Sequence, residues 1–206
     1  MKSHFTLLIC FFAFACTQKH IDTELEFVVP TYNPESYSIA RLDEAFYRNY
    51  NFIIDTNEHI YFYQYPIKYG WCGTITHADT FKIPPLINLR TTDITEIPLT
   101  SIGEFVKLNI IRGSYLNRQV VLASRLDTIR FKEFSQLVLL LKDSNNKTEW
   151  ILRKTTPEEE VVLDYKKKQS EYDSKKIRWD SSKTFFMETI EKKITKQLNE
   201  YRNRSR

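Results

Sequence analysis

Residues 119–153, QVVLASRLDTIRFKEFSQLVLLLKDSNNKTEWILR, decide the fold of this chain. An aliphatic, β-branched run at 119–124 predicts a buried strand. Apolar side chains then recur at helical spacing over 128–142, and after a turn signal at 143–146 a second strand is expected at 149–153. Strand, helix and strand in this order form a compact α/β unit, and a parallel pair of strands would take a right-handed crossover.

A β-hairpin is predicted on the N-terminal side of this unit. Two runs rich in aromatic and β-branched residues within 51–65 flank a polar stretch at 55–58, a pattern typical of two antiparallel strands and their connection. Tyr61, Tyr63 and Tyr65 would share one face of the second strand. That face is interpreted either as a half-buried sheet surface or as an aromatic strip that binds sugar or peptide.

Two shorter helical patterns lie on either side of the hairpin. Apolar residues at helical spacing predict a helix over 38–50. Ser101 and Glu104 match the capping-box pattern, which predicts the start of a short helix with its apolar face within 102–110.

The C-terminal part of the chain is predicted to be helical. Thr156 is a suitable N-cap, Pro157 is a preferred first helical residue, and the acidic triplet 158–160 complements the positive end of the helix dipole. The serine pair 181–182 can cap a second helix, whose apolar stripe would begin at Phe186.

Together these elements predict an α+β fold with a hairpin-containing N-terminal part, a strand-helix-strand unit and a helical basic C-terminus. The chain has 42% hydrophobic and 14% aromatic residues, enough for a packed core. The expected divisions are a leader at 1–15, a tether at 16–24, a globular domain at 25–155 and basic helices at 156–206.

The first sixteen residues, MKSHFTLLICFFAFAC, have the three-part layout of a secretory signal. Lys2 supplies the positive start, and an apolar run over 5–15 follows it. At about 1.5 Å rise per residue, that run covers only about half of a hydrocarbon core about 30 Å thick. A cleaved signal is therefore favoured over a permanent transmembrane helix.

The end of this leader resembles the lipobox of bacterial lipoprotein precursors, in which a cysteine is acylated and becomes the mature N-terminus. The corresponding residues are Ala13, Phe14, Ala15 and Cys16, and the bulky Phe14 departs from the usual small residue. The resemblance implies a cell-envelope protein held in the membrane by fatty acids such as palmitate. Thr17 replaces the aspartate of an inner-membrane retention signal, so the periplasmic face of the outer membrane is expected. The alternative is plain cleavage that leaves Cys16 unmodified.

Charge is distributed unevenly along the chain. Residues 16–164 contain 16 basic and 20 acidic side chains, whereas residues 165–206 contain 13 and 6. The basic tail is interpreted as a solvated helical face, a surface for anionic lipid or wall polymer, or a partner-binding helix. Nucleic acid is not expected as a partner of an exported protein. The lysines expected to contact an anionic surface are Lys166, Lys167, Lys168, Lys175, Lys176, Lys192 and Lys193.

One cluster suits nucleophilic catalysis, namely Cys72 with His77 and Asp79. In an extended strand Cys72 and His77 would point to opposite faces, and a buried, inert cysteine is the competing interpretation. Metal binding by this cluster, or by His59 with His77 and a carboxylate, lacks a diagnostic spacing. The four glycines form no phosphate-binding loop. No cofactor and no metal are therefore expected.

These observations predict an envelope protein that acts by binding or assembly rather than as an enzyme. The first alternative is an accessory subunit of an envelope transport or assembly complex, because residues 120–153 resemble in texture the periplasmic domain of biopolymer-transport proteins. That family keeps an uncleaved membrane helix, which this leader does not match. The second alternative is a thiol-dependent enzyme that uses Cys72.

Overall fold

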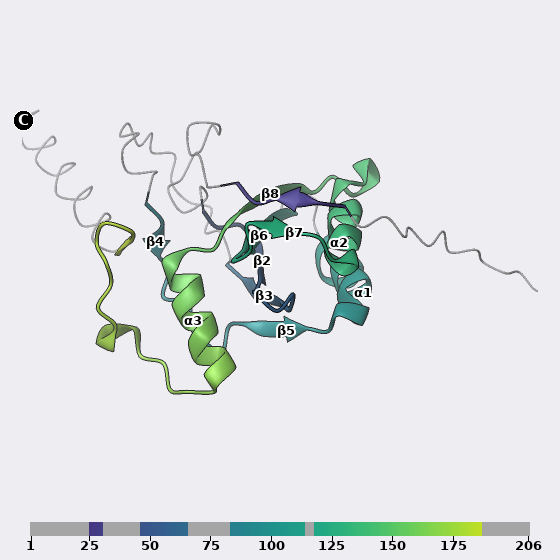
Figure 1. Ribbon diagram of the computed structural model, residues 1–206. Coiled ribbons are helices and arrows are strands. Elements are labelled where there is room, and N and C mark those ends of the chain that lie inside the picture. The colour runs from purple at the N-terminus through teal and green to yellow at the C-terminus, as the bar shows by residue number, and fades with distance from the viewer. Residues whose placement is uncertain (1–24, 31–45, 66–82, 114–117, 187–206) are drawn as a thin grey trace, which may run out of the picture.

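The computed structural model of the 206-residue chain describes residues 25–30, 46–65, 83–113 and 118–186 (Figure 1). It has the predicted α+β fold, and its main sheet contains five strands in the order β5-β3-β2-β6-β8. These strands are β2 (Tyr50–Ile54), β3 (Ile60–Gln64), β5 (Thr95–Ile97), β6 (Gln119–Ser124) and β8 (Glu149–Lys154). Two short pairs lie outside it: β1 (Phe27–Val28) with β7 (Thr128–Ile129), and β4 (Pro85–Leu86) with β9 (Phe185–Phe186).

The strand-helix-strand prediction is confirmed. β6 and β8 are parallel neighbours, and α2 (Lys132–Lys142) lies between them in the chain. The helix begins later than the periodicity indicated, because residues 128–129 form β7 and pair with β1. The apolar side chains that α2 buries are Phe134, Leu137, Val138 and Leu141.

The predicted hairpin is also confirmed, with β2 antiparallel to β3 and parallel to β6. Asp55 directly follows β2 and stabilises the connection, because its Oδ1 accepts the backbone N–H groups of Asn57 at 2.8 Å and His59 at 2.9 Å. An aspartate that bonds to the backbone two and four residues ahead replaces the strand ladder with a local turn.

Helices cover both faces of the main sheet. Figure 1 shows α1 (Ile102–Val106) and α2 on one side, and α3 (Pro157–Lys168) on the other. Alternate residues of β2 point to opposite faces of the sheet. Phe52 and Ile54 belong to the core under α1 and α2, whereas Ile53 belongs to the core under α3. All three are fully buried, as expected for a strand covered on both faces.

The short helix predicted near residue 102 is present, but its capping box is not. Ser101 makes no side-chain bond to the helix start, because it has helical backbone angles at the end of a 3₁₀ turn, Leu99–Ser101, and not the extended angles of an N-cap. Its backbone N–H bonds to the Pro98 carbonyl. α1 then continues into a π-helical turn, Lys107–Ile111. The apolar face follows the prediction, with Ile102, Val106 and Ile110 buried.

The start of α3 follows the sequence signals closely. Thr156 is the N-cap and Pro157 the first residue, and a reciprocal capping box forms with Glu159. The helix packs on the sheet through Val162 and Leu163, which are fully buried. The core therefore continues beyond the domain boundary expected at residue 155.

Two predicted helices are wrong where the structure describes them. Residues 46–49 are irregular and Tyr50 begins β2, so the helix predicted over 38–50 does not reach its expected end. Residues 181–183 form a turn and Phe186 lies in β9, because this segment pairs with β4 instead of continuing as a helix. The rest of both predictions lies outside the described residues.

No helix among residues 25–30, 46–65, 83–113 and 118–186 has the length and apolar character needed to cross a membrane. The leader and Cys16 lie outside these ranges.

Candidate functional site

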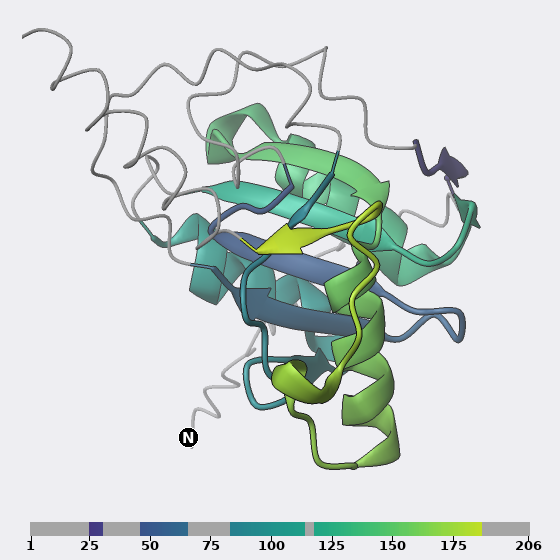
Figure 2. The same ribbon diagram turned by 90° about the vertical axis from the view of Figure 1, so that its left-hand side faces the viewer.

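A cleft of about 610 Å³ lies at the C-terminal end of α3, above β3 and β5. Figure 2 shows α3 lying across the strands, with the chain turning away after its last residue. The cleft is lined from the sheet side by His59, Tyr61, Thr91 and Glu96, and from the helix side by Tyr165, Lys166, Lys167, Gln169 and Ser170. A volume of a few hundred cubic ångströms is typical of small-molecule sites.

Ion pairs join α3 to three parallel strands. One partner is in β8, one directly follows β6 and one directly follows β2, so all three come from the same end of the sheet. The pairs are Arg153–Glu159 at 2.7 Å, Arg125–Asp164 at 2.8 Å and Asp55–Lys167 at 2.7 Å. Because the last pair involves a cleft residue, the same interactions that hold the helix also shape the cleft.

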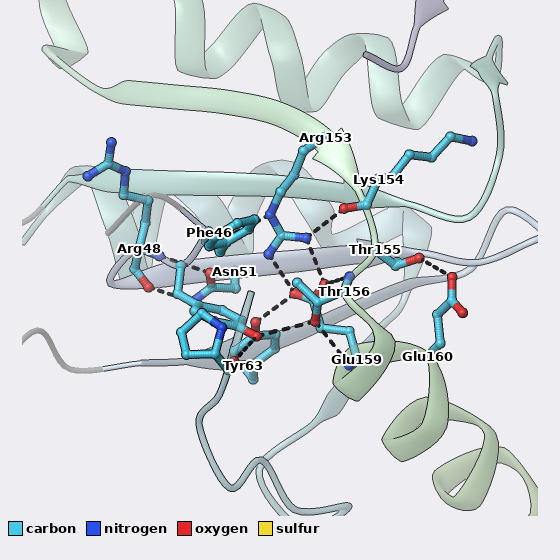
Figure 3. A network of polar contacts seen from close by, with 12 residues as sticks. Phe46, Arg48, Asn51, Tyr63, Arg153, Lys154, Thr155, Thr156, Glu159 and Glu160 are labelled. Carbon is cyan, nitrogen blue, oxygen red and sulfur yellow. Dashed lines mark hydrogen bonds and ion pairs between the residues drawn. The ribbon is translucent and has the colours of Figure 1, made fainter. Parts of the chain in front are cut away.

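The first pair is the centre of a buried network (Figure 3). Arg153 and Glu159 are 1% and 0% exposed and share two hydrogen bonds of 2.7 and 2.9 Å. The Tyr63 hydroxyl donates to Glu159 at 2.7 Å, and the Thr156 N–H donates to the other carboxylate oxygen at 2.7 Å. Burial alone would lower the pKa of Arg153, but Glu159 raises it, so the guanidinium keeps its charge.

A second buried carboxylate positions one wall of the cleft. Glu158 accepts the backbone N–H of Ile87 at 2.7 Å and that of Leu89 at 2.9 Å, while Asn88 between them has a positive φ of 59°. Successive N–H groups in this conformation form a nest for an anion. The segment that this nest anchors leads directly to Thr91, which lines the cleft.

Burial raises the pKa of Glu158 to about 7, although bonds from Ile87 and Leu89 act in the opposite direction. The neighbouring Glu159 charge adds to the increase. Glu158 therefore changes its charge near neutral pH, in contrast to an ordinary surface glutamate.

His59 and Glu96 form the polar centre of the cleft. The ring Nδ1 lies 2.8 Å from Glu96 Oε1, and the two side chains are 49% and 53% exposed. A proton on Nδ1 that is donated to the carboxylate leaves Nε2 as an acceptor in the neutral ring. The imidazole stacks on Tyr61, with ring centroids 6.4 Å apart and planes inclined by 19°.

Tyr61 lies beneath this pair. Burial, and then the charge of Glu96, raise the pKa of the Tyr61 phenol to about 12. The phenol is therefore neutral at physiological pH and can both donate and accept a hydrogen bond.

On the helix side, Lys167 is held by Asp55. Burial would raise the pKa of Asp55, but Lys167 and the N–H groups of His59 and Asn57 together lower it below its usual range. Asp55 is fully buried and ionised, so it neutralises Lys167. α3 ends at Lys168, and its C-cap residue Gln169 has the left-handed conformation with φ 53°. The next residue, Ser170, lines the cleft.

The residues predicted to form a site fall into three groups: some line the cleft, some are exposed elsewhere, and some lie outside the described residues. Lys166 and Lys167 line the cleft, and Lys168, Lys175 and Lys176 are exposed, with Lys176 3.5 Å from Asp173. Those that lie outside the described residues are Cys16, Cys72, His77, Asp79, Lys192 and Lys193. The hypothesis of a Cys72 enzyme therefore stays a prediction.

Of the two interpretations of the tyrosine face, the structure supports the sheet surface that packs into the core and not the binding strip. Tyr61 and Tyr63 are only 4% and 1% exposed because α3 covers this face of the sheet, and the Tyr63 hydroxyl is bonded to Glu159. Tyr61 reaches the cleft, but as the support of the His59 ring.

His59 with Glu96 was not predicted as a pair. The two residues are 37 positions apart and meet because β3 pairs with β5, where Tyr61 lies opposite Glu96. No group of three or more potential metal ligands occurs within the described ranges. The imidazole and carboxylate of the His59–Glu96 pair can form hydrogen bonds with a polar ligand.

No family model matches the chain, and comparisons with characterised proteins and with solved structures found no significant match.

Proposed function

We propose that this chain is a lipid-anchored cell-envelope protein that acts by binding a polar ligand in the cleft at the end of α3. The observation that supports binding is the preorganised His59–Glu96 pair, which is partly exposed while its supports are buried. Fixed polar groups in a concave site are typical of ligand recognition. The lipobox-like end of the leader supports the anchor.

Binding is favoured over catalysis by the surroundings of His59. In the part of the chain that the structure describes, its ring contacts Glu96 and the Tyr61 ring, and no hydroxyl is hydrogen-bonded to it. A nucleophile that depends on a histidine base needs that bond. The described side chains of the cleft therefore provide hydrogen-bonding groups for a ligand and no side-chain hydroxyl activated by His59.

The anchor is tested at Cys16. The natural mature protein should begin with Cys16 and carry fatty acids, because at least two acyl chains are needed for stable membrane attachment. A Cys16→Ser variant should leave the membrane fraction, as measured by intact mass spectrometry and fractionation. Cys10→Ser is the matched control, since it changes the part of the leader that is expected to be removed. A mature terminus without fatty acid would contradict the anchor.

The cleft is tested by amide NMR of the full chain in detergent micelles. Adding the small polar molecules extracted from the envelope should shift the amides of Thr91, Glu96 and Ser170. Glu96→Gln should abolish these shifts or weaken the binding at least about tenfold, the range expected for loss of a charged hydrogen-bond acceptor. Glu149→Gln is the matched control, because Glu149 is also an exposed carboxylate on an edge strand, β8, and bonds to Gln119. An equal loss of binding in both variants would contradict the proposal that the cleft is the binding site.

A further inference from the structure

The balance of charge in the cleft indicates what kind of ligand it accepts. Lys167 is neutralised by Asp55, which leaves Lys166 as a basic group on the wall and Glu96, whose Oε1 is bonded to the His59 ring, as an acidic group. An anion such as phosphate would be attracted by one and repelled by the other, and so would a cation. A ligand without net charge meets neither penalty.

The hydrogen-bonding groups indicate a ligand that donates and accepts at the same positions. Glu96 is only an acceptor and Lys166 only a donor, whereas the hydroxyls of Thr91 and Ser170 and the amide of Gln169 do both. A phosphate or carboxylate offers acceptors alone and could not donate to the Glu96 oxygen that the His59 ring leaves open. A neighbouring set of hydroxyl groups can satisfy every one of these side chains.

Ring surfaces accompany these polar groups. The His59 ring, stacked on Tyr61, presents a partly exposed face from the sheet side. Tyr165 faces the cleft from α3 and is held edge-on by Tyr172, with ring centroids 5.4 Å apart. Aromatic faces pack against apolar C–H surfaces, and a pyranose ring combines such a surface with a rim of hydroxyls.

We infer that the cleft binds a neutral saccharide, with Glu96 and Lys166 bonding to its hydroxyl groups and the His59 and Tyr165 rings packing against its C–H surface. This inference rests on the proposed function, since it names the ligand class of the same cleft. His59 and Glu96 are already positioned before a ligand binds, because the His59 backbone N–H bonds to Asp55 and its ring Nδ1 bonds to Glu96. This reduces the entropy cost of binding.

The test titrates the full chain in detergent micelles with neutral trisaccharides of glucose, N-acetylglucosamine, mannose and galactose. At least one should give saturable shifts at Thr91, Glu96 and Ser170 in the amide NMR spectrum. Because the ligand is uncharged, the affinity should not fall as salt is raised, whereas binding of an anion to Lys166 would weaken. Glu96→Gln should raise the dissociation constant at least about tenfold, and Glu149→Gln should leave it unchanged.

The other outcomes separate the ligand class from the site. If inorganic phosphate or the dipeptide Ala-Ala shifts the cleft amides and no saccharide does, the saccharide inference is overturned while the binding function stands. If saccharides bind equally well to Glu96→Gln, the proposed contacts are overturned. If neither the saccharides nor the envelope extract shifts any cleft amide, both the inference and the proposed function fail.

Discussion

Replacing Arg153 with methionine should lower the free energy of unfolding by about 3–5 kcal/mol, because removal of one partner leaves a buried charge uncompensated. Glu159 would remain fully buried and lose both guanidinium hydrogen bonds. Tyr63 and the Thr156 N–H would still donate to it, but neither carries a charge. Urea denaturation of the full chain measures the loss.

The exposed pair Arg130–Glu26 provides the matched control. Its N···O distance is 2.9 Å, close to that of the buried pair, but its side chains are 68% and 54% exposed. Arg130→Met should change the free energy of unfolding by less than about 1 kcal/mol. A double variant Arg153→Met/Glu159→Gln should lose less than the two single variants together, since the second change removes the unpaired charge. Similar small effects at Arg153 and Arg130 would disprove the role assigned to the network.

Stability should decrease as the pH rises from about 4.5 to about 7. Glu158 has a pKa raised to about 7 in the folded protein, against a usual value of 4.5, so the folded state binds this proton more tightly than the unfolded state. Its contribution is fully present below about pH 4.5 and is lost as the pH rises through about 7, by about 3 kcal/mol in total. Denaturation curves at pH 5, 6, 7 and 8 would show the decline.

Variants of two neighbouring glutamates test whether Glu158 causes this dependence of stability on pH. Glu158→Gln should flatten the curve, because glutamine cannot titrate. Glu160→Gln should preserve it, since Glu160 lies in the same helical turn but is exposed. Asp55 has a pKa lowered from 3.8, so its titration changes the stability only below about pH 3.8 and does not contribute between pH 5 and 8. A wild-type protein with constant stability between pH 5 and 7, or a slope that survives Glu158→Gln, would refute the assignment.

The sequence predicts the fold best where the signal is local. Hydrophobic periodicity identified β6, α2 and β8, and the capping residues at 156–157 identified the start of α3. Local patterns misled where a distant partner decided the outcome. Residues 128–129 have a helical pattern but pair with β1, about a hundred positions earlier, and residues 185–186 pair with β4. Tertiary pairing outweighs a weak local preference in both cases.

The candidate site could not be predicted in the same way. His59 meets Glu96 across 37 positions, and Lys167 meets Asp55 across 112. Both contacts depend on strand register and on the course of α3 over the sheet, which single-sequence periodicity does not determine. Arg153 and Glu159 are only six positions apart, so an arginine near the end of a strand before an acidic helix start was the one local signal available.

The most direct test of ligand binding in the cleft is the reactivity of His59 toward diethyl pyrocarbonate, which modifies an imidazole nitrogen. His59 is half exposed and its Nδ1 is engaged by Glu96, so modification should occur at Nε2. Peptide mass spectrometry of the mature protein follows His20, His59 and His77 separately. The proposed function predicts that the envelope's small polar molecules slow modification of His59 and leave the rates at His20 and His77 unchanged. An unchanged rate at His59 with saturating extract would contradict it.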